Sequence, residues 1–563
     1  MNNIYRLLAI LSYPLIVCFL LIYISYKYRE VFIKYYKKIF LVLLLFTLIG
    51  TLAIFSYFQI EKNAIYVYDN AGYYVKSLEM LQIFYENPSQ LFNKVYTTIN
   101  TSDYSYLPSL FNFWPLLINN SYPFYCLINF YIFLLPTIYL LLLLYYRYYD
   151  GYLLPLLVLL AFYPLWITIF YGRVDVLGLL PLLVFYIITL FNNYEDINKL
   201  DVLILNFLTL LLMFERRWYL FALVGAYLAY MVKGIIYAYK NHKWLSSALK
   251  FTLSGLLALI ILLIFFRGFF INVMMVNNVE AYAYYNHEGK VLAIINFFSL
   301  FISLVALYAL AKLLILKKEF ALSLIIIILI PTFLFFRTQS FDIHHYLIIT
   351  LAFLFLFIYG LKALKEQYLQ IMLISLLLIQ SFIVFTPYEL PLFTKTKKHI
   401  EENPYKEGLI DLSNYLKEIA RDDGIFSYVA TGNNLICDEA IKNATLPDID
   451  FPNMVSYVFD IRDGFPRDFA YIKYFVISDP ILYLDENYQH LYKVISDGIM
   501  HDEEVSKIFT LRNEFILGKD DDKVKVYIYE LTGNYNENIK EYFYQKMIAY
   551  YPDKKDFFAY ILD

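Results

Sequence analysis

Charged residues are scarce in the middles of the apolar segments of this chain and gather at their ends. The residues at these ends include Asp69, Asp103, Arg173, Asp175, Glu215, Arg216, Arg217, Arg267, Arg337, Asp342, His344 and His345. Carboxylates and imidazoles can move protons, and a guanidinium can hold a phosphate through two parallel hydrogen bonds. Ionisable residues deep within a membrane are costly and usually mark a pathway. This distribution therefore favours a site at one membrane surface over a polar path through the membrane.

Twelve apolar segments could position these residues. A helix crosses a bilayer with roughly 20 apolar residues, and the chain is 60% hydrophobic, with 17% charged residues and a mean hydropathy of +0.55. The predicted spans cover residues 5–26, 39–58, 122–146, 152–170, 175–191, 201–214, 218–238, 247–266, 291–311, 320–336, 345–361 and 368–386. The first lacks the features of a cleaved signal peptide and is predicted to be retained. We therefore predict a polytopic α-helical membrane domain over residues 1–388.

Basic residues predict the orientation of these spans. They follow the odd-numbered spans, at Lys27, Arg29, Lys34, Lys37, Lys38, Arg147, Lys199, Lys240, Lys243, Lys250, Lys312, Lys317, Lys318, Lys362 and Lys365. Loops rich in lysine and arginine stay in the cytoplasm. The loop 59–121 and the tail from residue 389 are therefore predicted to be extracytoplasmic, in a multi-pass protein of the plasma (inner) membrane.

The region 389–563 has the composition of a soluble domain. It carries 32 acidic and 20 basic residues, a net charge of −12, whereas the rest of the chain has 17 acidic and 26 basic residues, a net charge of +9. Its acidity disfavours nucleic acid as a partner. Strand patterns at 426–431, 474–478 and 524–529 alternate with helical patterns at 408–421, 488–509 and 539–550. This alternation predicts a small C-terminal α/β domain.

The first predicted outer loop contains VYDNAGYYVKSLEML at 67–81 and TSDYSYLPSLFNFWP at 101–115. Here the chain resembles the GT-C superfamily of polyprenyl-phosphate-sugar glycosyltransferases, which includes protein O-mannosyltransferases and lipid A aminoarabinose transferases. These enzymes place an acidic residue just after a transmembrane helix, at the start of a long outer loop, and Asp69 occupies that place. Many members have an adjacent acidic pair, whereas Asn70 follows Asp69 here. Further segments similar to the family are YGRVDVLGLLP at 171–181, FERRWYLF at 214–221 and RTQSFDIHHYL at 337–347.

The resemblance implies transfer of a sugar from a polyprenyl phosphate to an extracytoplasmic glycan, lipid or protein. The leaving phosphate gains negative charge, which arginine can hold, and a carboxylate can take the proton of the acceptor hydroxyl. The candidate catalytic residues are Asp69, as general base or acceptor orienter, and Asp103. The candidate residues for the donor phosphate or sugar are Arg216, Arg217, Arg337, His345, Asp175, Tyr73 and Tyr104.

Ordinary structural roles compete with these assignments. Asp69 and Asp175 could be helix N-caps, and Glu215 could neutralise the arginine pair beside it. The adjacent histidines 344 and 345 suggest a divalent cation, but a metal site needs further ligands, so no cofactor is assigned. The main alternative function is a non-enzymatic translocase of lipid or polysaccharide, or an envelope binding protein. A transporter, however, would need a polar pathway that the apolar span centres do not provide.

Overall fold

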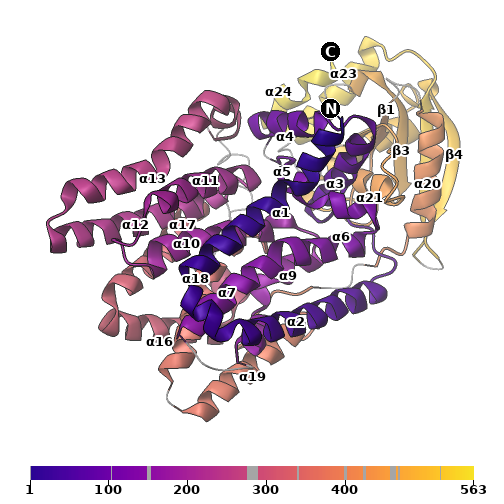
Figure 1. Ribbon diagram of the computed structural model, residues 1–563. Coiled ribbons are helices and arrows are strands. Elements are labelled where there is room, and N and C mark those ends of the chain that lie inside the picture. The colour runs from indigo at the N-terminus through magenta and orange to yellow at the C-terminus, as the bar shows by residue number, and fades with distance from the viewer. Residues whose placement is uncertain are drawn as a thin grey trace. The chain divides into compact units, whose positions relative to one another are not determined.

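The contacts of the chain divide it into two units. The computed structural model describes residues 2–102, 104–148, 154–274, 290–338, 341–364, 366–398, 402–421, 426–456, 465–466, 469–519 and 522–562. Unit 1 comprises Met1–Phe58 and Lys76–His399, and unit 2 comprises Gln59–Val75 and Ile400–Asp563. Figure 1 shows the helices of unit 1 and the mixed sheet and helices of unit 2.

Unit 1 is built from helices. Its first part contains α1 (Asn2–Lys27), α2 (Arg29–Ile60), α3 (Asp69–Glu86), which begins in unit 2, α4 (Gln90–Thr101), α5 (Leu107–Asn112), α6 (Tyr122–Asn129), η2 (Phe130–Leu134), α7 (Leu135–Tyr148), α8 (Leu154–Ala161), η3 (Tyr163–Leu165) and α9 (Ile167–Phe170). Its second part contains η4 (Val174–Gly178), α10 (Leu179–Tyr186), η5 (Ile187–Phe191), α11 (Lys199–Glu215), α12 (Tyr219–Asn241), α13 (Trp244–Phe265), η6 (Phe269–Met274), α15 (Lys290–Phe298), α16 (Leu300–Leu316), α17 (Lys318–Phe336), α18 (Leu347–Ala363) and α19 (Gln367–Ile383).

Seven helical segments of the described chain are long and apolar enough to cross a membrane, and the bent pair α15–α16 could form an eighth. The seven are Asn2–Lys27, Arg29–Ile60, Tyr122–Tyr148, Val174–Phe191, Tyr219–Asn241, Trp244–Phe265 and Lys318–Phe336. These helices fit the predicted membrane-embedded helical protein. The finer prediction of about 12 spans goes beyond this number.

The remaining predicted spans are helical but short or interrupted. In the fourth, η3 with Pro164 separates α8 from α9. Proline has no backbone N–H and disrupts a regular helix. In the ninth, α15 and α16 are bent by 103° at Ser299, which has a φ of +80°. The sixth, eleventh and twelfth correspond to α11, α18 and α19, which have 17 residues each.

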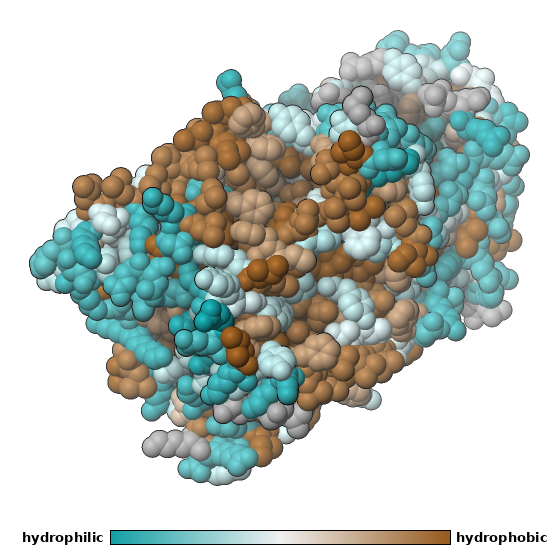
Figure 2. Space-filling view, viewed as in Figure 1, coloured by the Kyte–Doolittle hydropathy of each residue, from teal (hydrophilic) through white to brown (hydrophobic). Residues whose placement is uncertain are grey.

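Several of the long helices leave their apolar side chains exposed. Only 28% of the most apolar window of α1, 22% of that of α2 and 17% of that of α13 is buried. Figure 2 shows apolar side chains gathered over the helices of unit 1 on the viewed face. An exposed apolar surface of this extent requires an apolar partner, and lipid around a helical protein supplies one.

The segment Val174–Phe191 forms the centre of unit 1. Of its most apolar window 94% is buried, and every residue of α10 is buried. A helix that is apolar on all sides can only be accommodated inside a protein or a membrane. Its beginning in η4 places Asp175 within the protein interior, where the carboxylate is 1% exposed.

Unit 2 is an α/β domain with a five-stranded sheet in the order β2-β1-β3-β5-β4. Its strands are β1 (Phe426–Val429), β2 (Met454–Ser456), β3 (Ile472–Asp479), β4 (Phe509–Leu517) and β5 (Val524–Leu531). The β1 strand pairs in parallel with β2 and β3, and β5 pairs antiparallel with β3 and β4. The helices are α20 (Lys406–Ile419), α21 (Asp438–Asn443), α22 (Gln489–His501), α23 (Glu537–Tyr550) and α24 (Lys555–Phe558). They build two apolar cores, one around Leu412 and Val476 and one around Tyr428 and Phe543.

The predicted strands at 426–431, 474–478 and 524–529 correspond to β1, β3 and β5. The predicted helix 488–509 is wrong beyond His501, because α22 ends there and β4 begins at Phe509. The β4 strand lies at the edge of the sheet and contains the polar run Arg512, Asn513 and Glu514. An edge strand pairs on one side only and tolerates exposed charge, so it lacks a strong apolar signature.

The start of the predicted outer loop folds with unit 2. Ile65 is buried in the core that contains Leu409 and Val429. The Asn443 amide donates to the carbonyl of Tyr66 at 2.8 Å, and the backbone N–H of Tyr68 donates to the Glu439 carboxylate at 2.6 Å. The sequence-based division at residues 388 and 389 did not foresee that 59–75 packs with the C-terminal residues.

Candidate functional site

A buried ion pair joins two of the sequence-predicted residues in unit 1. Arg216 Nε lies 2.9 Å from Asp175 Oδ1, and the two side chains are 3% and 1% exposed. Asp175 lies in η4, directly before the central helix α10, and Arg216 follows the last residue of α11 in an extended conformation. Asp175 is thus an ion-pair partner and not the helix N-cap, a position that Arg173 occupies in η4.

Aromatic side chains enclose the guanidinium of Arg216. Its Cζ atom lies 3.8 Å from the ring centroid of Trp218 and 5.2 Å from that of Tyr104. A cation over an aromatic face is stabilised by the ring quadrupole, more strongly where water is excluded. The direction of the Arg216 side chain is therefore set by Asp175 and by two rings.

The loop between α17 and α18 adds two histidines to the same place. The ring of Trp218 lies 5.2 Å from that of His344 and 4.8 Å from that of His345. Arg173 Nη1 lies 2.5 Å from the Asp342 carboxylate and also contacts Nδ1 of His344. We call this set the arginine cluster; it consists of Arg173, Asp175, Arg216, Trp218, Asp342, His344 and His345.

Electrostatic surroundings set the charge states of two groups in this loop. Desolvation opposes ionisation of Asp342, but Arg173 and His344 outweigh it and hold the pKa of Asp342 well below its usual value. Burial, with a smaller contribution from His344, holds the pKa of His345 well below its usual value. The Nδ1 atom of His345 accepts the backbone N–H of Asp342 at 3.0 Å, as a neutral imidazole can. The two pKa shifts favour an ionised Asp342 and a neutral His345.

Two lysines lie at the edges of the arginine cluster. Lys398 is 2% exposed, and its Nζ lies 4.5 Å from the ring centroid of Tyr171, which Arg173 also approaches at 5.7 Å. Lys76 Nζ lies 5.1 Å from the ring centroid of Tyr104 and donates to its carbonyl at 3.0 Å. These lysines extend the positive charge beyond the two arginines.

Glu215 does not neutralise the arginine beside it, because Asp175 pairs with Arg216. The side chain of Glu215 is 1% exposed, and neither of its carboxylate oxygens has a hydrogen-bond partner among the described residues. A buried ionised carboxylate without a partner is costly. Glu215 is therefore a second unusual carboxyl group next to the cluster.

Four of the predicted site residues come together in unit 1: Asp175, Arg216, His345 and Tyr104. Arg337 follows α17 and is exposed, and Arg217 is half-buried. Asp103 lies outside the residues that the structure describes.

Asp69 and Tyr73 belong to unit 2. Asp69 is the first residue of α3, where a carboxylate also interacts favourably with the helix dipole. Tyr73 is 3% exposed. The catalytic assignment of Asp69 stays a prediction.

Sequence reasoning missed Trp218 and Lys398 as site residues. Trp218 follows the arginine pair directly, and an aromatic residue next to buried arginines is a signal that could have been used. Lys398 could not have been found, because nothing in the sequence brings it to Tyr171, which is more than 200 positions earlier.

Among the described residues, no three or more His, Cys, Asp or Glu side chains are arranged so that they could hold a metal ion. No protein family model matches the chain, and no curated protein and no solved structure matches it either.

Proposed function

We propose that this chain is a membrane glycosyltransferase that moves a sugar from a polyprenyl phosphate to an extracytoplasmic glycan, lipid or protein. The observation that supports this most is the arginine cluster. There Arg216 is buried among helix ends, with one side on Asp175 and one face on Trp218. Cations that are oriented before the reaction stabilise charge that develops on a leaving group.

The charge balance around the cluster favours an anion. The basic side chains are Lys76, Arg173, Arg216 and Lys398, and the acidic ones are Asp175, Glu215 and Asp342. The excess of positive charge lies in a mostly apolar unit, where electrostatic attraction is stronger than in water. A phosphate at the end of an apolar chain matches both properties.

The proposed reaction exchanges one bond to the anomeric carbon for another. The acceptor oxygen bonds to that carbon, while the bond from the carbon to the phosphate oxygen breaks and its electrons leave with the phosphate. The hydroxyl proton passes to a carboxylate, and Asp69 is the proposed acceptor of that proton. A single displacement of this kind inverts the configuration of the sugar.

The proposal includes about 12 membrane spans, an outward-facing loop 59–121 and an outward-facing unit 2 in the plasma membrane. It can be tested with single cysteines in a chain whose Cys18, Cys126 and Cys437 have been replaced. Gln90→Cys, Thr338→Cys and Glu503→Cys are expected to react with an impermeant maleimide in intact cells, and Lys38→Cys and Lys312→Cys only after lysis. Labelling of the lysine-site variants in intact cells would contradict the orientation.

The activity test uses the purified full-length protein in detergent, radiolabelled polyprenyl-phosphate hexoses and an extract of envelope acceptors. We expect transfer by the wild-type protein. In Arg216→Lys the transfer rate should fall at least about 100-fold, because a lysine ammonium cannot replace the planar guanidinium, which contacts both Asp175 and Trp218. Arg512→Lys, an exposed arginine in unit 2, is the matched control and should keep full activity.

The variant Asp69→Asn tests the predicted base independently of the residues that are proposed to bind the donor phosphate. Loss of transfer with unchanged donor binding supports Asp69 as the base, and full transfer removes it from the mechanism. Binding of the donor that depends on Arg216 without any transfer by the wild-type protein would contradict the transferase and favour a translocase. Transfer that is equal in wild type and Arg216→Lys would remove the arginine cluster from the reaction.

A further inference from the structure

A cavity in unit 1 lies where α7 and η5 meet α17 and α18. It has a volume of about 240 Å³ and is lined by residues from these four elements and by Lys317, which directly precedes α17. None of the residues of the arginine cluster lines it. The cavity is thus separate from the proposed donor site.

The walls of this cavity are apolar. Phe191 contacts Phe320 and Phe355, with ring centroids 5.3 and 4.9 Å apart, and Leu141 and Leu190 complete this part of the lining. A hydrocarbon chain is stabilised when it leaves water for such an apolar surface. The walls therefore fit a lipid chain better than a sugar.

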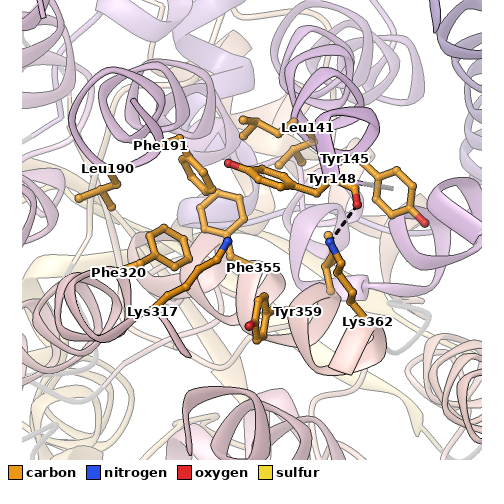
Figure 3. A pocket seen from close by; sticks show the side chains of 12 residues that line it. Leu141, Tyr145, Tyr148, Leu190, Phe191, Lys317, Phe320, Phe355, Tyr359 and Lys362 are labelled. Carbon is orange, nitrogen blue, oxygen red and sulfur yellow. Dashed lines mark hydrogen bonds between the residues drawn. The ribbon is translucent and has the colours of Figure 1, made fainter. Parts of the chain in front are cut away.

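Two lysines give the cavity a positively charged part. Lys317 Nζ lies 5.8 Å from the ring centroid of Tyr148, and Lys362 Nζ donates to the Tyr148 carbonyl at 3.1 Å. Figure 3 shows the two lysine side chains on either side of Tyr359. Arg147 also approaches the ring of Tyr148, at 5.7 Å. Three cations therefore lie around one tyrosine beside an apolar cavity.

We propose that this cavity binds a resident anionic membrane phospholipid, with its phosphate held by Lys317 and Lys362 and the start of its chains against the phenylalanines. Lysine ammonium groups bind phosphates as point charges, and basic pockets between membrane helices suit anionic headgroups. Among the described residues that line the cavity there is no carboxylate that would repel the phosphate. The lysines follow predicted spans nine and eleven, so the predicted orientation places the lipid in the cytoplasmic leaflet.

The test measures lipid binding by native mass spectrometry of the delipidated full-length protein. The probes are dioctanoyl phosphatidylglycerol, dioctanoyl phosphatidylcholine and inorganic phosphate. We expect one phosphatidylglycerol to bind tightly, phosphatidylcholine to bind more weakly, and inorganic phosphate not to compete. The double variant Lys317→Ala/Lys362→Ala should weaken phosphatidylglycerol binding roughly thirtyfold, since the two lysines are expected to contribute about equally to the affinity for the anionic headgroup.

The matched control removes two exposed lysines elsewhere in unit 1, Lys243 and Lys312, and should change binding less than twofold. Leu190→Trp fills the apolar part of the cavity. It should weaken phosphatidylglycerol binding without creating affinity for inorganic phosphate. Equal binding by wild type and the lysine double variant would overturn the proposal. Competition by inorganic phosphate would overturn the lipid as occupant, and equal binding of phosphatidylcholine would overturn the role of the lysines. The two lipids compared on wild type keep the test decisive if a variant fails to fold.

Discussion

Unit 1 and unit 2 both use an arginine to hold a carboxylate, but in opposite surroundings. Arg216 and Asp175 in unit 1 are 3% and 1% exposed. In unit 2, Glu530 is held by Arg512 and Lys473, whose side chains are 47% and 42% exposed. Exposed pairs contribute little to stability, and buried pairs must offset a large desolvation cost.

Of these two ion pairs, only the one in unit 1 carries a large desolvation cost. The Arg512 contact sits on the sheet surface, where water would solvate either charge if the other were lost. The Arg216 contact lies between helix ends, where both side chains are buried. A buried pair is weak support for stability in itself, so its presence in unit 1 agrees with a functional role for the charges.

The largest expected effect comes from Arg216→Met, which leaves Asp175 buried without its partner. We expect the free energy of unfolding to fall by about 3–5 kcal/mol and transfer activity to be lost. Thermal unfolding in detergent, followed by tryptophan fluorescence, measures the first effect. The double variant Arg216→Met/Asp175→Leu should recover most of the stability but none of the activity. Recovery of both would contradict the proposed role of Arg216.

Trp218→Leu should have the next largest effect. It removes the ring that lies 3.8 Å from the Arg216 guanidinium and also contacts His344 and His345. A desolvated cation–π contact contributes about 2 kcal/mol, so we expect the free energy of unfolding to fall by an amount of that order. Donor binding should also become weaker. Trp218→Phe keeps an aromatic face and should lose less of both. An equal loss in the two variants would show that packing, and not the contact to the guanidinium, is responsible.

His345 should make the stability of unit 1 depend on pH. Its pKa in the folded protein is well below the ordinary value of about 6.5, because burial disfavours the charged form. The unfolded chain therefore binds more protons below pH ~6.5, and stability should fall as the pH decreases from there towards the folded pKa. In His345→Gln this fall should be smaller. Thermal midpoints of the wild type and of His345→Gln between pH 7.5 and 5.0 provide the measurement. Identical profiles of the two proteins would show that His345 is not responsible for the fall in stability.

Arg512→Ala in unit 2 should have the smallest effect, about 1 kcal/mol or less, because the side chain is half-exposed and Lys473 still contacts Glu530. Neither transfer activity nor donor binding should change. Chemical denaturation of the full-length protein, followed by circular dichroism, measures the stability. A loss as large as that of Arg216→Met would remove the contrast between the two units.

Patterns that depend on neighbouring residues were predictable. The apolar runs identified the helices of unit 1, and the alternating pattern of Val524–Tyr529 identified β5, because burial on one side repeats with the period of the element. Edge strand β4 was missed because its polar residues carry no such repeat. The arginine cluster was foreseen only in part: Asp175, Arg216 and His345 were named, whereas their pairing and the contribution of Lys398 were not.

The sequence by itself determined that this chain is rich in membrane-length apolar helices, that its charges avoid the helix centres, and that its C-terminal part is an acidic α/β domain. These properties follow from composition and periodicity, which act over a few helical turns. The tertiary structure decided that Asp175 and not Glu215 pairs with Arg216, and that residues 59–75 fold with unit 2. Contacts between residues far apart in the chain depend on how whole helices pack, and side-chain spacing along one segment carries no information about that packing.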